Sequence, residues 1–397
     1  RQTTIRARRN SATGEWLPAA GNLVVRCDSS TALNPGDRAV VRGKIYPFTA
    51  RHGGYGRLMT RRGYVGTLYL NRSSLLLSDT LHRELSPKHL SLFLHERAVA
   101  RLDRLALAPD EQALCNAMTA GDRRSLSPAL RAAYSRSGTS HLLAVSGLHV
   151  GIVFLLANLL LWWLPLFRHG HILRNIAVIL LIWLYAATTG FPPSVVRAAL
   201  MFSVLQFALA SSSEYVGMNT LAGVAFVMLL FHPDYLFDIS FQLSFIAVAG
   251  IIAWGLPLCR LLRTRRKSID MLTATLAIGF SASAATAPLI SHTFGQISVV
   301  GLALNPVVIL LSYVVVGSCT LWLVIPGTAL APLFSVVAGF AARAQNELIR
   351  AAAALPAAAL DIRLTTTQCW IVYGLFIFAT LLLWSAERKK SVSSLPE

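Results

Sequence analysis

The chain of 397 residues has little charge, and acidic charge is the scarcest. Only 14% of its residues are charged, whereas a soluble globular domain carries about 25%. Lys and Arg number 36 against 18 Asp and Glu, which gives a formal net charge of +18, and 54% of the residues are hydrophobic. The low charge content argues against a soluble protein and indicates a membrane protein. The basic excess favours a polyanionic partner.

Cysteine patterns that mark metal or redox sites are also missing. The five cysteines form no Cys-x-x-Cys pair and show no spacing typical of zinc ligands. We therefore expect no metal centre and no other cofactor. Cys27 and Cys115 both lie in the N-terminal region, and the sequence leaves open whether they form a disulfide.

Long runs without charge begin at Ser137. The stretch from Ser137 to Phe167 contains no Lys, Arg, Asp or Glu, and about 20 apolar residues suffice to cross a ~30 Å hydrocarbon core. Cutting the later runs at turn-forming residues such as Phe294-Gly295-Gln296 predicts about nine membrane spans. These spans are expected at 141–166, 172–189, 194–211, 217–231, 236–257, 271–292, 297–325, 328–345 and 368–385.

The N-terminal region has a different pattern. Residues 1–72 contain short β-rich segments separated by turn formers, which predicts a small all-β domain of the OB-like barrel type. Strand-like sequence starts at Thr3, so we expect this domain to be incomplete at its N-terminal side. Residues 73–136 are predicted to form an amphipathic, interfacial helical linker. The fold class is thus a polytopic α-helical membrane protein with an N-terminal exterior β domain, a transmembrane domain at 137–386 and a tail at 387–397.

Lys and Arg asymmetry predicts the orientation. The two most basic clusters near the membrane are Arg260 to Lys267 and Arg388 to Lys390. Both fall on the cytoplasmic side if the N-terminal domain is outside, as the excess of positive charge in cytoplasmic loops requires. We therefore expect an exterior N-terminal domain and a cytoplasmic C-terminus.

Polar side chains in the first predicted span are the leading functional candidates. His141, Ser146 and His149 lie in apolar sequence, and Ser146 and His149 share a helix face at i and i+3. Close helix packing through Gly147 and Gly151, the lining or gating of a polar path, and nucleophilic catalysis by Ser146 with His149 as base all fit this pattern. An intramembrane serine hydrolase is accordingly an alternative function, although no acid that would orient His149 stands beside it.

A second group of candidates lies in later spans. Arg197 is a basic residue well inside a predicted span. Its side chain either reaches to the outer surface or contacts phosphate. Asp238 is its predicted ion-pair partner. Gln242, Ser244 and Asn305 are neutral polar residues that suit interhelical hydrogen bonds or a hydrophilic lining.

Four segments together resemble the ComEC family of competence proteins. They contain the sequences Ala-Met-Thr-Ala-Gly-Asp-Arg-Arg, His-Leu-Leu-Ala-Val-Ser-Gly-Leu-His-Val-Gly, Gly-Phe-Pro-Pro-Ser-Val-Val-Arg-Ala and Phe-Gln-Leu-Ser-Phe, and they lie at 117–124, 141–151, 190–198 and 241–245. The resemblance implies a channel of the bacterial inner (plasma) membrane that carries single-stranded DNA into the cytoplasm during natural transformation. It also implies partnership with DNA receptor and motor proteins, contact with the lipid bilayer, and a homo-oligomer. The chain itself is expected to be no enzyme.

Two further expectations accompany the resemblance. Many family members continue into a metallo-β-lactamase-like domain, but no His-rich motif of that kind occurs here, so either a separate nuclease supplies that activity or this branch lacks it. In the exterior domain, cations and aromatics interleave as in single-strand binding surfaces, and a solvated basic face or lipid contact fits equally. These DNA-binding candidates are Arg57, Arg61, Arg62, Tyr55 and Tyr64. A family relative that transports another polyanion or a small solute is the third functional alternative.

Overall fold

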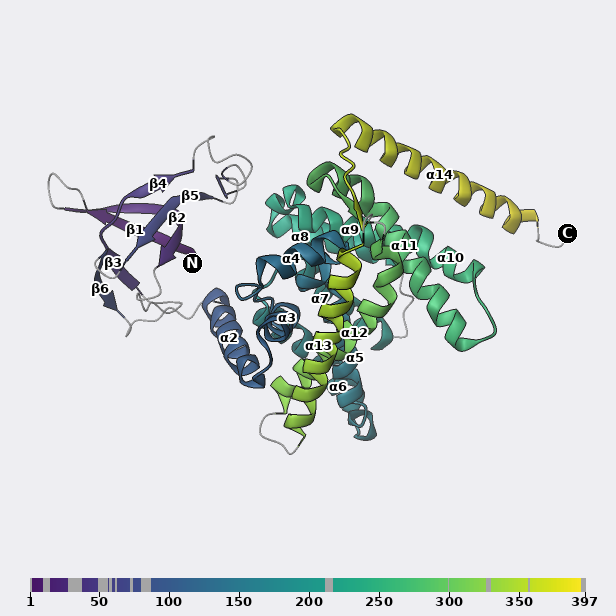
Figure 1. The fold of residues 1–397 in the computed structure, drawn as a ribbon, viewed down its shortest axis with the longest axis horizontal. Helices are drawn as coiled ribbons and strands as arrows, with labels where there is room; N and C mark the ends of the chain where they lie inside the picture. The colour runs from purple at the N-terminus through teal and green to yellow at the C-terminus, as the bar shows by residue number, and fades with distance from the viewer. Residues whose placement is uncertain are drawn as a thin grey trace. The chain divides into compact units, whose positions relative to one another are not determined.

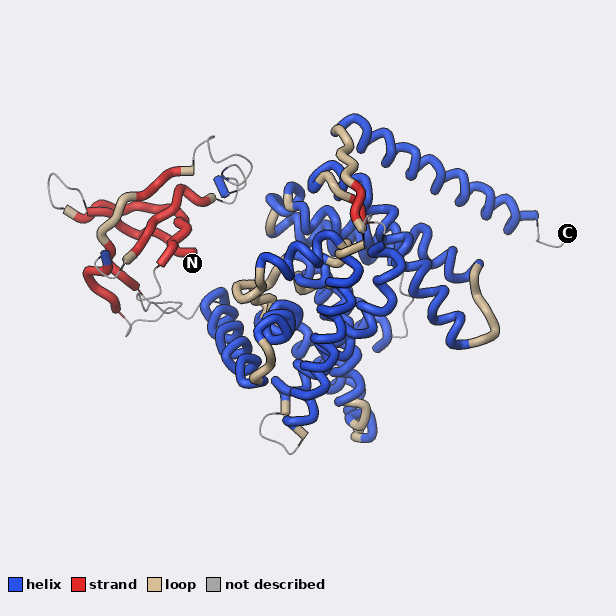
Figure 2. Tube along the Cα trace, viewed as in Figure 1, coloured by secondary structure: helices blue, strands red, loops and turns tan. Residues whose placement is uncertain are grey.

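The computed structural model divides into two compact units, Arg1–Phe93 and Leu94–Glu397. Strands make up most of the described residues of the first unit, and the described residues of the second unit form helices and loops apart from the short pair β7 (Ile297–Ser298) and β8 (Ala359–Leu360) (Figure 2). The residues that the structure describes are 2–9, 15–27, 38–48, 56, 59–60, 63–71, 74–79, 87–210, 217–298, 300–325, 330–355 and 358–393.

The first unit contains two sheets. The larger has the order β1-β2-β5-β4, with β2 and β5 parallel and the outer pairs antiparallel, while β3 and β6 pair separately. Its small core consists of Leu23, Val25, Leu68 and Leu70, because alternate residues of a strand face the same side. The OB-like classification stays a prediction. The strands are β1 (Gln2–Arg9), β2 (Trp16–Cys27), β3 (Arg38–Val41), β4 (Ile45–Pro47), β5 (Tyr64–Leu70) and β6 (Leu75–Asp79).

The second unit is a helical bundle (Figure 1). Several of its helices begin with proline in the first turn, where the missing N–H costs no hydrogen bond, and Ser127 caps the helix that follows it through a bond from the N–H of Leu130. The helices are α2 (Pro87–Leu102), α3 (Pro109–Thr119), α4 (Pro128–Arg136), α5 (Gly147–Leu160), α6 (Gly170–Thr188), α7 (Pro193–Ala210), α8 (Gly217–Phe231), α9 (Ile239–Gly250), α10 (Leu256–Leu261), α11 (Lys267–Phe294), α12 (Val300–Val324), α13 (Ala331–Ala353) and α14 (Thr366–Ser393).

Five helical segments in the described residues are long and apolar enough to cross a membrane, and three shorter apolar helices accompany them. Many of their large apolar side chains are exposed, including Leu159, Phe226 and Leu310, which a water-soluble surface rarely tolerates in such number. These features are those of a polytopic membrane protein. The long segments are Gly147–Leu166, Gly170–Thr188, Ile239–Leu261, Lys267–Phe294 and Ala303–Val324, and the shorter ones are Pro193–Ala208, Gly217–Phe231 and Thr366–Leu381.

The helix α13, on which the predicted span 328–345 falls, belongs to neither group of apolar helices. It packs against α3, α4 and α12. Glu111 of α3 pairs with Arg343 at 2.7 Å, and Asp110 pairs with Arg350. The side chains of α3 are mostly buried, so part of the region predicted as a linker contributes to the core of the second unit.

The apolar segment Ile239–Leu261 is interrupted by a π-helical turn, Ile251–Gly255, between α9 and α10. Gly250 lies at the crossing with α11. A Cβ at this position would stand 2.5 Å from the Ala285 Cβ and 3.0 Å from the Ser281 carbonyl oxygen. Only glycine therefore lets the two helices approach this closely.

Candidate functional site

The starts of α5 and α7 meet the middle of α9 at one place in the second unit. The Ser194 hydroxyl at the start of α7 donates to the Val145 carbonyl just before α5, at 2.9 Å. Arg197, one turn further along α7, donates through Nη1 to the backbone carbonyl of Ser244 in α9. Its Nη2 lies 3.1 Å from the position that a Cβ on Gly147 would take. Residues that are far apart in sequence thus surround the N-terminus of α5.

Ser146 and His149 form a capping box at this N-terminus. His149 Nδ1 accepts a hydrogen bond from the Ser146 backbone N–H at 2.9 Å and lies 3.0 Å from the Ser146 hydroxyl. The Ser146 side chain in turn accepts from the His149 backbone N–H. His149 therefore takes the place that Glu or Gln has in the usual box. The predicted proximity of the two side chains is present, and helix capping accounts for it.

We expect Ser146 to behave as a cap and not as a nucleophile. Ser146→Ala should lower the stability of the protein by about 1 kcal/mol, and the chain should not react with a fluorophosphonate probe. A catalytic base needs an orienting partner, and the buried His149 Nε2 has none among the described residues. Gel fluorescence with a serine hydrolase as positive control measures the labelling. A band that is lost in Ser146→Ala would favour the hydrolase alternative.

Arg197 is 5% exposed and lacks an anionic partner among the described residues. Its guanidinium carbon lies 5.6 Å from the centre of the Phe245 ring, within cation–π range. Nη1 reaches Ser244, whereas Nε is buried without a hydrogen-bond partner. A guanidinium kept from water in this way is costly unless an anion compensates it.

No ion pair joins Arg197 and Asp238 among the described residues. The Asp238 carboxylate caps α9, accepting from the backbone N–H of Ser240 at 2.8 Å and of Phe241 at 3.4 Å. An Asp at a helix start satisfies free backbone donors, and this local role takes precedence over the distant arginine.

The remaining predicted span residues lie at several places. Gln242 Nε2 donates to the Leu236 carbonyl at 2.8 Å, and Ser244 contributes its backbone carbonyl to Arg197. Asn305 lies in α12, where its buried Oδ1 has no partner within the described chain. His141 is exposed in a 3₁₀ turn, Ser140–Leu143, before α5. The structure therefore groups Ser146, His149, Arg197 and the Ser244 backbone, but not Asn305.

Most of the predicted DNA-binding residues, namely Tyr55, Arg57, Arg61 and Arg62, lie outside the described residues. Tyr64 begins β5 and is half-buried.

The structure shows a different cation–aromatic group in the first unit. Tyr46 and Tyr69 are 50% and 54% exposed, with ring centroids 5.7 Å apart. Arg26 lies over the Tyr69 ring and Lys44 over the Tyr46 ring, at 5.9 Å and 6.0 Å. We call these four residues the tyrosine pair face. Alternation in β5 was the signal that sequence reasoning missed, since Leu68 and Leu70 are buried and Tyr69 must face the other side.

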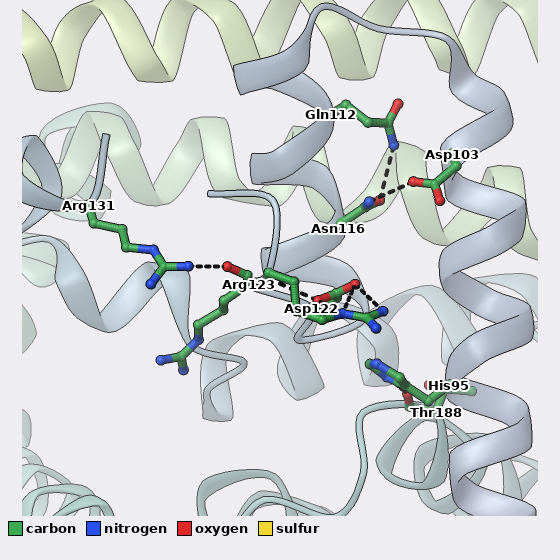
Figure 3. Close-up of polar contacts among 9 residues, drawn as sticks. His95, Asp103, Gln112, Asn116, Asp122, Arg123, Arg131 and Thr188 are labelled. Carbon is green, nitrogen blue, oxygen red and sulfur yellow. Dashed lines mark hydrogen bonds and ion pairs between the residues drawn. The ribbon is translucent and has the colours of Figure 1, made fainter. Parts of the chain in front are cut away.

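A second missed feature is the buried carboxylate of Asp122 (Figure 3). It accepts from the Arg124 backbone N–H at 3.0 Å and from the Arg124 guanidinium at 2.8 Å. Gly121 permits the turn with a φ of 81°. In the same view, His95 of α2 bonds the Thr188 carbonyl at the end of α6, at 2.9 Å. The Gly-Asp-Arg-Arg sequence in the family motif could have pointed to this feature. It forms an ordered turn between α3 and α4.

One polar side chain of α3 adds to this connection. Asn116 links Asp103, at 2.8 Å, to Gln112, at 3.0 Å (Figure 3). Cys115 is fully buried and its thiol is free.

Removing the Asp122 carboxylate should destabilise the protein at neutral pH. The side-chain hydrogen bond from Arg124 holds the pKa of Asp122 below its ordinary value, against the effect of burial. A lowered folded-state pKa adds stability above the unfolded pKa of about 4, and this stability is lost as pH falls through the folded pKa. Because the Arg124 side chain is 75% exposed, we expect Asp122→Ala to cost only about 1–2 kcal/mol.

Thermal unfolding in detergent between pH 3 and pH 7 tests this prediction. The difference between wild type and Asp122→Ala should shrink as the pH falls, whereas the exposed Asp361→Ala should match the wild type throughout. A difference that stays constant with pH would refute the electrostatic explanation.

Comparison with known proteins places this site within a matched region. The family model described as "Competence protein" matches residues 118–389. "ComE operon protein 3" of Bacillus subtilis (strain 168) is 33% identical over 204 residues, which cover 50% of this chain and 24% of that protein. An "Uncharacterized protein" of Aquifex aeolicus (strain VF5) is 29% identical over 201 residues, which cover 50% of this chain and 45% of that protein. The matched residues thus span about a quarter of the Bacillus protein and less than half of the Aquifex protein. No solved structure matches the chain.

Proposed function

Because this chain belongs to the competence protein family, we propose that it is a component of a bacterial plasma-membrane channel that imports DNA during natural transformation. The strand that passes is single-stranded DNA. Several apolar helices provide the membrane part, and the buried polar cluster at the start of α5 lies within it.

The observation that carries the DNA assignment is the tyrosine pair face. Exposed aromatic rings bind unpaired bases by stacking, at about 1–3 kcal/mol per base, and neighbouring cations attract the backbone. Tyr46 and Tyr69 supply two such rings, and Arg26 and Lys44 supply the charge. Both tyrosines are exposed on the strand unit, so packing of the hydrophobic core does not explain their presence there.

The orientation follows from charge. The basic loop around Arg263, Arg265 and Arg266 and the tail Arg388 to Lys390 face the cytoplasm, and the strand unit faces outward. This arrangement has nine crossings, with α13 as the eighth. Arg343 and Arg350 of α13 pair with Glu111 and Asp110 of α3. DNA receptor and motor proteins, a separate nuclease and a second copy of this chain are the proposed partners.

Import of labelled DNA tests the proposal. Cells that lack the chain should accumulate no nuclease-protected label in the cytoplasm. Tyr46→Ala combined with Tyr69→Ala should reduce import several-fold, because two stacking contacts are lost. The matched control is Val65→Ala, an equally exposed side chain of the same sheet. Undiminished import in cells without the chain would exclude the function.

A further inference from the structure

We propose that the N-terminus of α5 and the guanidinium of Arg197 form a binding site for a phosphodiester oxyanion, supplied by the backbone of a single DNA strand. The choice of DNA as the source rests on the proposed function. The site itself rests on the geometry around Gly147.

The N-terminus of α5 offers unused backbone donors. The capping box engages the N–H groups of Ser146 and His149. The N–H groups of Gly147 and Leu148, at the first two helical positions, have no carbonyl within the helix to bond. They point out of the helix start, where the helix dipole also favours an anion. The helix has 14 residues, so its dipole is well developed.

Arg197 supplies the charge that completes the site. Its side chain is 95% buried and has no carboxylate partner within the described chain. Nη1 is occupied by the Ser244 carbonyl, Nε has no hydrogen-bond partner, and Nη2 is directed at Gly147. A buried cation with free donors beside free backbone N–H groups is the arrangement that an anion would compensate.

Gly147 lets the Arg197 guanidinium approach the start of α5 closely. A Cβ there would stand 3.1 Å from Arg197 Nη2, closer than most real Cβ contacts. Ser146, Gly147 and Leu148 are all partly exposed, whereas Arg197 beside them is buried. Ser194 fixes the spacing by its bond to the Val145 carbonyl.

A phosphodiester suits this donor set better than a halide does. Two phosphate oxygens span the planar fork of an arginine, and the remaining lone pairs accept from backbone N–H groups. A phosphodiester carries one negative charge, which matches the one guanidinium at this site. Two sources of this chemistry exist near a membrane, namely the DNA backbone and the headgroup of an anionic lipid.

Ligand-dependent thermal unfolding of the purified full chain in detergent distinguishes them. The probes, at constant ionic strength, are thymidylyl-thymidine, which has one phosphodiester, thymidine, which has none, and glycerophosphoglycerol, the headgroup of phosphatidylglycerol. Thymidylyl-thymidine should raise the wild-type unfolding midpoint by about 2–4 °C, and thymidine should not change it. Arg197→Gln should abolish the shift and Arg197→Lys should keep part of it.

Arg174→Gln is the matched control, since Arg174 already bonds Asn158 Oδ1 at 2.9 Å and should leave the shift intact. A cooperative transition without ligand shows that a variant is folded. If Arg197→Gln does not fold, the test rests on Arg197→Lys, which should show a smaller shift than the wild type. A shift that survives in Arg197→Gln, or no shift in the wild type, would overturn the site. A larger shift with glycerophosphoglycerol would overturn the DNA assignment. None of these results touches the import assay, so the two proposals fail separately.

Discussion

Replacing Arg197 by Gln should reduce transformation at least about tenfold in cells that contain normal amounts of the protein. Losing a charge-assisted hydrogen bond removes roughly 1.5–3 kcal/mol, and each 1.4 kcal/mol is a factor of ten in binding. Arg197 is directed at the start of α5 and bonds the Ser244 carbonyl, so the variant loses both the proposed phosphate contact and a link between α7 and α9.

Counting transformants against viable cells measures the effect, with an immunoblot of membranes to normalise for protein level. Arg197→Lys keeps the charge but not the planar fork, and we expect an intermediate frequency. Arg174→Gln should transform nearly as the wild type does, because its partner Asn158 is a protein group. Normal transformation by Arg197→Gln at normal protein level would remove this residue from the DNA path.

The second large effect is expected at Gly250. Gly250→Leu should lower the amount of folded protein severely, because even the first carbon of the new side chain would stand 2.5 Å from the Ala285 Cβ. Overpacking in a close-packed interior costs typically 1–3 kcal/mol, and a larger side chain against the Ser281 backbone adds to this cost. Much of the total stability of a typical protein, about 5–15 kcal/mol, is then lost.

Yield from membranes and the midpoint of thermal unfolding in detergent report the loss. Gly223→Leu in α8 is the matched control, since nothing lies within 4 Å of a Cβ there. The control should be neutral or slightly stabilising, because glycine is a poor helix former. Equal yields for the two variants would show that α9 and α11 do not pack as described.

Much of the helical architecture could be predicted from the sequence, but little of the packing between helices could. Runs without charge predicted where most apolar helices lie, because the need to bury backbone groups leaves few alternatives in lipid. The burial of α3 was not predictable in this way. Its acidic residues Asp110 and Glu111 suggested an exposed helix, yet they pair with Arg350 and Arg343, more than two hundred residues later.

The candidate site was predictable only where it is local. Ser146 and His149 meet because a helix start brings i and i+3 together, which their spacing alone implied. The approach of Arg197 to Gly147 depends on how α5 and α7 pack, and no short-range pattern encodes it. For Asp238, the local preference for a helix cap was present in the sequence and outweighed the long-range pairing that charge alone suggested.

The π-helical turn at Ile251–Gly255 changes the phase of the helix that contains it. In an α-helix, residues five apart point about 140° away from each other, given 3.6 residues per turn. Gly250 and Gly255 nevertheless both lie against Ser281 of α11, because the wider turn brings the fifth residue back to nearly the same side. Deleting one residue within this turn would rotate the end of the segment, Leu256–Leu261, by about 100°. Exposed side chains there, such as Leu256 and Leu261, would then point in another direction.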